Sequence, residues 1–273
     1  MKKVILALML MASLSFAACN KDTTTPDNST TSNQATTTDD ANKTDDANKT
    51  DDANKTDDAE KPEDNAGEKA EIKSIDAAEL EKMQLDKKLK EQNLVVDVRS
   101  KEEYDAGHLS HAVNIGVDDI VADPSILEEY KDKPIILYCN SGKKSGKAAE
   151  ALVNAGYKDI TNAPGVKEFE YTLIDIPAVL GKDLQKVADE GSATLIDARD
   201  AKDYEEGHLK GAINANADNV KDMLADIPKD KPVYTYCYSG NKSIEVAKIL
   251  KAEGYEVYNS NDGTKEYEFT LEK

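Results

Sequence analysis

The sequence predicts an α/β protein made of two tandem copies of one domain, each a mainly parallel sheet with helices on both faces. Three observations lead to this expectation. The last part of the chain repeats the part before it at an offset of about 100 residues, β-rich apolar runs alternate with helical patterns in both copies, and apolar residues are concentrated after Glu71. The expected segments are residues 1–18, a signal peptide; 19–70, a linker; 71–173, the first domain; and 174–273, the second.

The N-terminus has the pattern of an export signal. Two lysines precede an apolar run from Val4 to Leu14, which is too short to span a bilayer. The run leads into Phe16-Ala17-Ala18-Cys19, which resembles a bacterial lipobox and implies cleavage before Cys19 and diacylglyceryl attachment to its sulfur. The alternative is an ordinary cleavage site with an incidental cysteine. We expect a protein anchored in the cell envelope by this lipid and facing outside the cytoplasm, with the membrane as its partner.

A polar repeat makes up much of the expected linker. A hexad of the form Thr-Asp-Asp-Ala-Asn-Lys starts at Thr38, Thr44 and Thr50, and again imperfectly at Thr56. Because no period gives it an apolar face, the segment is predicted to be an acidic disordered spacer that spans roughly 40 Å. Metal binding by its aspartate pairs is the alternative.

The two copies define the expected strands and helices. Short β-rich runs lie at residues 94–98 and 134–138, and again at 193–196 and 232–236. Residues 145–155 and 243–253 carry apolar side chains at helical spacing and stop at Gly156 and Gly254. A further acidic helix is expected between Ala77 and Leu89, as a solvated face.

Composition excludes several function classes. A net charge of −19, no tryptophan and three phenylalanines argue against a nucleic-acid partner. Three cysteines and three histidines are too few for a disulfide framework or a closed structural zinc site of the usual spacing. No metal and no cofactor are therefore expected.

The expected chemistry lies in two related loops. Each starts at a cysteine that ends an apolar strand and runs into a helix: Cys139-Asn140-Ser141-Gly142-Lys143-Lys144-Ser145 and Cys237-Tyr238-Ser239-Gly240-Asn241-Lys242-Ser243. Open α/β sheets place ligands at this end of their strands. Converging backbone N–H groups, the positive end of the helix and a lysine all favour a thiolate and attract an anion. An inert core cysteine and a structural disulfide are the alternatives.

These motifs together resemble the rhodanese family, the thiosulfate sulfurtransferases. The resemblance covers residues 71–273 and rests on motifs present twice, in the same order: Asp97-x-Arg99 and Asp197-x-Arg199, Tyr104-x-x-Gly-His-Leu and Tyr204-x-x-Gly-His-Leu, and the two cysteine loops. It implies that Cys139 and Cys237 are catalytic nucleophiles that carry sulfur as a persulfide. The residues 140–144 and 238–242 would bind substrate. Thiosulfate or another small sulfur anion would be the donor, and a thiol or cyanide the acceptor.

Other repeated residues are expected to be structural. The resemblance places His108 and His208 at a turn away from the loops, and His111, which Gly211 replaces in the second copy, is expected at the surface. The Asp-x-Arg pairs are expected to brace the strand ends. Pro164-Gly165 and Asp262-Gly263, where the family has Gly-Gly, are expected to be packing positions. A non-catalytic binding module and a dual-specificity phosphatase of related fold remain alternative functions.

Overall fold

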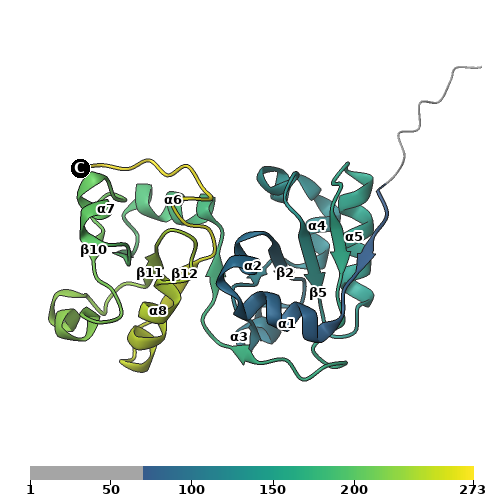
Figure 1. Cartoon of the computed structure of the whole chain (residues 1–273), viewed down its shortest axis with the longest axis horizontal. Helices are drawn as coiled ribbons and strands as arrows, with labels where there is room; N and C mark the ends of the chain where they lie inside the picture. The colour runs from purple at the N-terminus through teal and green to yellow at the C-terminus, as the bar shows by residue number, and fades with distance from the viewer. Residues whose placement is uncertain (1–69) are drawn as a thin grey trace, which may run out of the picture. The chain divides into compact units, whose positions relative to one another are not determined.

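The computed structural model describes residues 70–273, drawn in colour in Figure 1. The predictions for the signal peptide, for Cys19 and for the linker lie outside these described residues. Within residues 70–273, no helix combines the length and the apolar character needed to cross a membrane.

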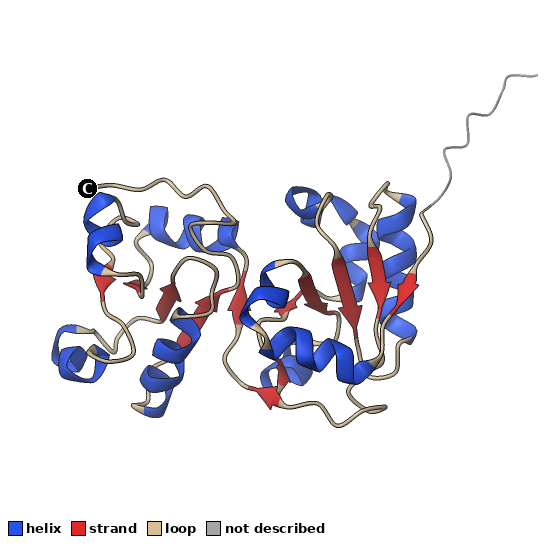
Figure 2. Cartoon of the chain, viewed as in Figure 1, coloured by secondary structure: helices blue, strands red, loops and turns tan. Residues whose placement is uncertain are grey.

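A sheet of ten parallel-paired strands forms the centre of the described part (Figure 2). Five strands come from each copy, and the two sets meet where Val113 of β4 pairs with Ala178 of β8. The order across the sheet is β1 (Lys73–Ser74), β6 (Ile160–Asn162), β5 (Ile135–Tyr138), β2 (Leu94–Asp97), β4 (Val113–Asn114), β8 (Ala178–Val179), β12 (Val257–Ser260), β11 (Val233–Tyr236), β9 (Thr194–Asp197) and β10 (Ile213–Asn214). A separate antiparallel pair joins β3 (His108–Leu109) to β7 (Leu173–Ile174).

Helices cover both faces of the sheet. They are α1 (Ala77–Leu85), α2 (Lys87–Glu91), α3 (Lys101–Asp105), α4 (Val117–Ala122), α5 (Lys143–Asn154), α6 (Gly181–Glu190), α7 (Ala201–Glu206) and α8 (Ser243–Ala252), with 3₁₀ helices at Pro124–Tyr130 and Val220–Asp226. Successive residues of one strand enter different cores: Leu94 and Val96 of β2 lie in one apolar cluster, and Val95 lies in another. A strand buried on both faces belongs to a sheet covered on both sides, which confirms the predicted fold class.

The prediction of one solvated helix between Ala77 and Leu89 was wrong in two respects. The first helix ends at Leu85. The carboxylate of Asp86 then accepts hydrogen bonds from the backbone N–H groups of Lys88 and Leu89 and so starts a second helix. The face is also not wholly solvated, because Leu80 is fully buried and Lys90 is 1% exposed. Charge composition did not reveal that α2 packs against other parts of the chain.

The expectation that His111 lies at the surface was also wrong. Its side chain is 5% exposed, and its backbone has a positive φ of 64°. Gly211, at the same place in the second copy, has a φ of 70°. Both copies therefore make the same left-handed turn, which glycine adopts without strain and histidine does not.

The two Asp-x-Arg motifs brace the strand ends, as predicted. Arg99 donates to both carboxylate oxygens of Asp97, with the shortest contact at 2.6 Å, and also to the carbonyl oxygen of Gly107. Arg199 makes the same contacts with Asp197 and with the carbonyl of Gly207. Each buried pair therefore ties the end of a strand to the glycine of the Gly-His sequence.

Candidate functional site

The first cysteine loop connects the carboxyl end of β5 to the start of α5. Cys139 is 2% exposed, and Gly142 adopts a positive φ of 71° at the position before the helix. The hydroxyl of Ser145, in the first turn of α5, lies 3.4 Å from Cys139 Sγ and donates to it. The loop therefore curls back so that the helix start faces the sulfur.

The surroundings of Cys139 favour its ionised form. Burial raises the pKa of this thiol, but the Ser145 hydroxyl and the backbone N–H groups of Ser145, Ser141 and Lys144 act in the opposite direction. The net result is a pKa below that of an ordinary thiol. Hydrogen bonds from fixed donors stabilise a thiolate, which is the nucleophilic form of cysteine.

The second cysteine loop repeats this geometry after β11. Cys237 is 1% exposed and accepts from the backbone N–H of Lys242 at 3.3 Å and from the hydroxyl of Ser243 at 3.5 Å. Gly240 has a φ of 78°, matching Gly142. Neither Cys139 nor Cys237 is in a disulfide, so that alternative is excluded for both.

A glycine from a neighbouring segment supports each loop. A Cβ atom on Gly165 would lie 2.1 Å from the backbone of Asn140, and one on Gly263 would lie 2.1 Å from the backbone of Tyr238. The residue after each glycine donates to the carbonyl of the cysteine, at 3.0 Å in both copies. Each cysteine loop can pack this closely against its supporting segment only because glycine has no side chain.

An acidic residue holds the residue that follows each loop cysteine. The side-chain amide of Asn140 donates to Glu103 of α3 at 2.7 Å, and the hydroxyl of Tyr238 donates to Asp203 of α7. The amide hydrogen bond is the main cause that lowers the pKa of Glu103, with smaller contributions from Arg99 and Lys144. These contacts attach each cysteine loop to the helix that follows the Asp-x-Arg pair, which is α3 in the first copy and α7 in the second.

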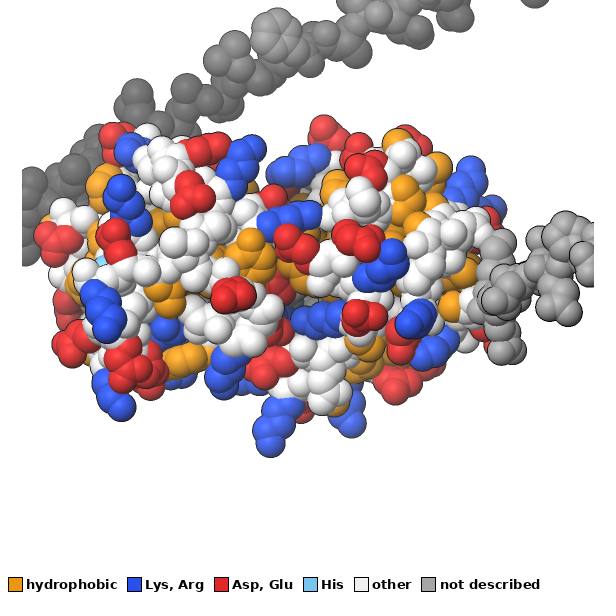
Figure 3. Space-filling view, turned by 90° about the horizontal axis from the view of Figure 1, so that it is seen from above, with side chains coloured by type: hydrophobic (Ala, Val, Ile, Leu, Met, Phe, Trp, Pro, Cys, Tyr) orange, Lys and Arg blue, Asp and Glu red, His pale blue; other side chains and the backbone are white. Residues whose placement is uncertain are grey.

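The loop lysines differ between the copies. Lys143, Lys144 and Lys242 are all exposed, but Lys242 also pairs with Asp200 at 3.0 Å and lies over the ring of Tyr238. Figure 3 shows acidic and basic side chains intermixed on one face of the described part. On that face, an anion would therefore meet both signs of charge rather than one acidic patch.

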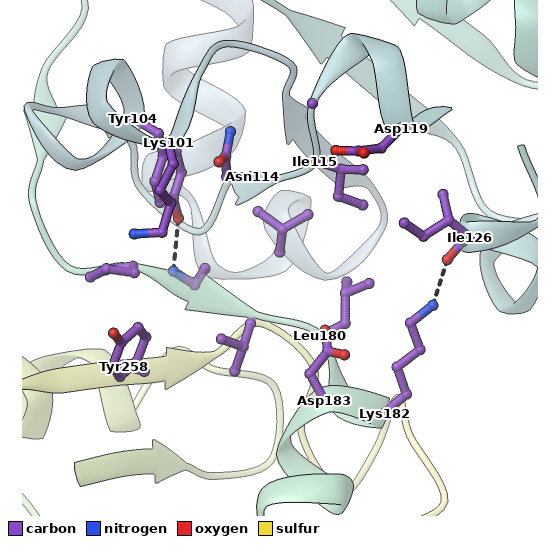
Figure 4. A pocket seen from close by; sticks show the side chains of 15 residues that line it. Lys101, Tyr104, Asn114, Ile115, Asp119, Ile126, Leu180, Lys182, Asp183 and Tyr258 are labelled. Carbon is purple, nitrogen blue, oxygen red and sulfur yellow. Dashed lines mark hydrogen bonds between the residues drawn. The ribbon is translucent and has the colours of Figure 1, made fainter. Parts of the chain in front are cut away.

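A cavity of about 350 Å³ lies where β4 meets β8, away from both cysteine loops (Figure 4). Its polar side chains are largely engaged already. Lys182 donates to the carbonyl of Ile126, and the hydroxyl of Tyr104 accepts from the backbone of Ala178. The residues that line it include neither cysteine, so the chemistry of the predicted site does not take place there.

The two histidines of the Gly-His motifs lie in aromatic stacks. His108 stacks on Tyr104 at 3.8 Å between ring centroids, and His208 stacks on Tyr204 at 3.9 Å. Burial is the main cause that lowers the pKa of His108. Within residues 70–273, no cluster of three or more histidine, cysteine or acidic side chains has the arrangement of a metal site.

Among the residues that the structure brings to the loops, sequence reasoning assigned no role to Ser145, Ser243 or Lys90. Ser145 and Ser243 donate to the two sulfurs, and their recurrence six residues after each cysteine was a usable signal. Lys90 contacts the second loop from the first domain. No pattern in the sequence pointed to that contact, because it depends on how the two copies pack.

Comparison with known proteins gives a family match in both copies. A model described as a rhodanese-like domain matches residues 76–167 and 181–269. A protein named tRNA sulfurtransferase from Pyrobaculum aerophilum is 39% identical over 67 residues, and an uncharacterized protein named YqhL from Bacillus subtilis is 38% identical over 76 residues. The matches cover 24% and 28% of this chain, and 14% and 60% of those two proteins.

Solved structures of related proteins also match. A rhodanese with anions from E. coli is 30% identical and covers 30% of this chain and 96% of its own, with a TM-score of 0.28. A thiosulfate sulfurtransferase from Pseudomonas aeruginosa is 17% identical and covers 74% of this chain and 43% of its own, with a TM-score of 0.32.

Proposed function

This chain belongs to the rhodanese-like domain family, and from that membership we propose that it is a sulfurtransferase that carries sulfane sulfur on Cys139 and Cys237. The observation that carries the proposal is the set of donors around Cys139 Sγ: a hydroxyl and three backbone N–H groups that hold the pKa of the thiol below its ordinary value. A thiol prepared in this way is a nucleophile at neutral pH. The relative named tRNA sulfurtransferase supports sulfur transfer as the class of reaction.

The proposed reaction has two displacement steps. The cysteine thiolate attacks the outer sulfur of thiosulfate, a new S–S bond forms, and the original S–S bond breaks with its electron pair leaving on sulfite. An acceptor thiolate or cyanide then attacks the outer sulfur of the persulfide, and the cysteine leaves as a thiolate. The loop residues would hold the anionic persulfide through their N–H groups, and the exposed Lys143 and Lys144 would attract the donor.

Mass spectrometry after incubation with thiosulfate tests this proposal directly. The variants Cys139→Ser and Cys237→Ser should each gain one sulfur atom, on the remaining loop cysteine, and the double variant should gain none there. Each single variant is the matched control for the other. If neither cysteine takes up sulfur from thiosulfate or from a persulfide donor, the protein is instead a binding module for sulfur anions or for a partner in the cell envelope.

The location of the protein belongs to the same proposal. We propose that a lipid on Cys19 anchors the chain in the cell envelope, facing outside the cytoplasm, with the acidic repeat as a spacer. The lipobox-like sequence supports this. Expression in bacteria fed a labelled fatty acid should label the wild-type protein and not Cys19→Ser, and only the wild type should sediment with membranes. Equal labelling or equal sedimentation of both proteins would contradict the anchor.

A further inference from the structure

The two cysteine loops have similar sequences but different surroundings. Ser141 and Lys143 of the first loop are exposed, whereas Ser239 and Asn241, at the same positions of the second loop, are 5% and 8% exposed. The cover over the second loop is helix α2 of the first domain, which Figure 1 shows at the boundary between the two copies. The second site is therefore built partly from the first domain.

Lys90 of α2 places a buried positive charge against the second loop. Its ammonium group donates to the carbonyl oxygens of Ser239 at 2.7 Å and Asn261 at 2.5 Å. It also lies 3.7 Å from the carboxylate of Glu266. Burial is the main cause that lowers the pKa of Lys90, and the charges of Glu266, Asp262 and Cys237 raise it. The amine therefore contacts the backbone of the second loop two residues after Cys237.

The hydrogen bond from Lys90 also fixes the direction of a backbone N–H group. The carbonyl of Ser239 and the N–H of Gly240 belong to one peptide unit, and in a trans peptide these two groups point in opposite directions. Because Lys90 holds the carbonyl, the N–H of Gly240 is directed away from α2. Lys90 therefore limits the rotation of this peptide and helps to keep a donor available within the loop.

Glu91, the next residue of α2, closes the outer side of the second loop. Its carboxylate accepts from the hydroxyl of Ser239 at 2.5 Å and from the side-chain amide of Asn241 at 3.2 Å. Asn241 also donates to the backbone carbonyl of Lys87 at 3.2 Å. Glu91 and Lys87 of α2 thus hold the side chains of Ser239 and Asn241, which would otherwise face solvent.

The residue of the second copy that matches Lys90 does not cover the first cysteine loop. At the offset of 100 residues, Lys90 corresponds to Glu190, whose side chain is 52% exposed and lies 4.0 Å from Lys186 of its own helix. Beside the second loop, a cavity of about 240 Å³ is lined by Lys87, Asp200, Asn241, Lys242 and Glu245, among others. Its lining includes the carboxylates of Asp200, Asp218 and Glu245 and does not include Cys237, so this cavity is not itself the binding site of a sulfur anion.

We propose that Lys90 and Glu91 are specificity-determining residues of the second cysteine site. Both cysteines are buried, but α2 covers only the second loop, so these residues restrict Cys237 to small sulfur anions while Cys139 also reacts with thiols on larger molecules. Glu91 excludes large reagents by holding the loop closed, and Lys90 is a positioning residue that orients the loop and supplies positive charge. This inference rests on the proposed sulfur transfer: at Cys237 both the donor and the acceptor would be small, such as thiosulfate and cyanide, whereas at Cys139 a larger thiol would also discharge the persulfide.

Reagents of one chemistry and two sizes test the cover. N-ethylmaleimide and a maleimide carrying a long polyethylene glycol chain are applied to the full-length variants Cys139→Ser and Cys237→Ser, and the rate at each loop cysteine is read from its peptide. We expect the rate ratio of large to small reagent to be about tenfold lower at Cys237 than at Cys139. Glu91→Ala should raise this ratio at Cys237 severalfold and leave it unchanged at Cys139, which is the internal control.

Reagents of one size and two charges test Lys90. Iodoacetate is an anion and iodoacetamide is neutral, so their rate ratio reports the local potential. In Lys90→Met, the ratio of iodoacetate to iodoacetamide should fall about tenfold at Cys237 and stay constant at Cys139. Glu91→Gln keeps the hydrogen-bond acceptor and removes its charge. In this variant the ratio of iodoacetate to iodoacetamide should rise at Cys237, while the ratio of large to small maleimide stays low. Glu91→Gln therefore keeps the test valid if Lys90→Met does not fold.

Two outcomes would overturn the inference. One is equal size selectivity at both cysteines, which would mean that α2 does not cover the site. The other is a Cys237 that reacts with neither the large nor the small reagent, because the site would then be closed to all donors. Both are distinct from a failure of the proposed function, in which no sulfur is taken up from any donor whatever the alkylation rates show.

Discussion

At the scale of single residues, the hydroxyl of Ser145 helps to set how readily Cys139 ionises. It is one of the donors that lower the pKa of this thiol, and it is fully buried beside the sulfur. Ser145→Ala removes the donor and should raise the pKa of Cys139, which moves the midpoint of its alkylation profile to higher pH. A hydrogen bond worth about 1 kcal/mol corresponds to a rate about fivefold lower at any pH below that midpoint.

The measurement is the pH dependence of iodoacetamide reaction at Cys139 in the Cys237→Ser background. Ser243→Ala in the same background is the matched control, because its hydroxyl contacts the other sulfur. The control should leave the profile of Cys139 unchanged. A profile of Ser145→Ala that coincides with the parent would show that the backbone N–H groups alone set the pKa.

His111 makes stability depend on pH. Burial is the main cause that lowers its pKa from 6.5 to about 3, and the nearby charges of Lys90 and Lys248 act in the same direction. The unfolded chain takes up a proton below pH 6.5, and the folded chain does not until about pH 3. The stabilising effect of the neutral ring is therefore complete above pH 6.5 and is lost as the pH falls from 6.5 towards 3.

His111→Asn should remove this part of the pH dependence, and asparagine also tolerates the left-handed backbone at this position. Between pH 7 and pH 5, the free energy of unfolding should fall by about 2 kcal/mol more in the wild type than in His111→Asn. Urea unfolding at the two pH values measures the difference. A fall in the free energy of unfolding that is as large in His111→Asn as in the wild type would contradict the prediction.

At the scale of elements, each cysteine loop depends on a glycine outside it. Gly165→Ala would place a Cβ atom 2.1 Å from the backbone of Asn140, so the loop must move. Overpacking of this kind lowers the free energy of unfolding by about 1–3 kcal/mol. The displaced donors should also slow alkylation at Cys139 and leave Cys237 unaffected.

Gly146→Ala, within α5, is the matched control for Gly165→Ala. Its Cβ atom would lie 3.4 Å from the side-chain amide of Asn162, which is ordinary van der Waals contact, and alanine favours the helix by about 1 kcal/mol. Denaturant unfolding and the alkylation rate of Cys139 should show no loss in this variant. A Gly165→Ala protein as stable and reactive as Gly146→Ala would mean that the loop tolerates the displacement.

The elements themselves were largely readable from the sequence. The expected strand at residues 94–98 is β2, Leu94–Asp97, and the expected helix at 243–253 is α8, Ser243–Ala252. Apolar runs and stop signals define such elements because burial and backbone geometry act locally. The expected helix between Ala77 and Leu89 includes the start of α2, but the sequence did not show that α2 is a separate helix, since its five residues have no apolar period and it is held by contacts with distant residues.

At the scale of the whole described part, buried polar contacts join the two copies. The hydroxyl of Tyr130 donates to Asp262 at 2.5 Å, and the same carboxylate oxygen accepts from the backbone N–H of Gly181. Lys133 pairs with Glu266 at 3.2 Å. Asp262 was expected at a packing position, but it is a buried carboxylate that links the first domain to the second. The two domains should therefore unfold together.

Tyr130→Phe tests this coupling between the domains. Loss of the hydroxyl leaves the buried Asp262 with one donor fewer, so the free energy of unfolding should fall by about 1–3 kcal/mol, and the single thermal transition should broaden or split. Tyr157→Phe is the control, because its hydroxyl donates to Pro124 within the first domain. That variant should lose stability but keep one transition. A sharp single transition in Tyr130→Phe would show that the sheet contact alone couples the domains.

The sequence by itself determined the two-domain α/β fold and the two cysteine loops. Repeats, strand-forming runs and the residues after each cysteine are local patterns, and local backbone preferences translate them into structure. Only the tertiary structure decided that the two loops differ. The cover over Cys237 comes from α2, about 150 residues earlier in the chain, through contacts of Lys90 and Glu91 with Ser239. Such contacts depend on how two similar domains pack, which a repeat pattern does not specify.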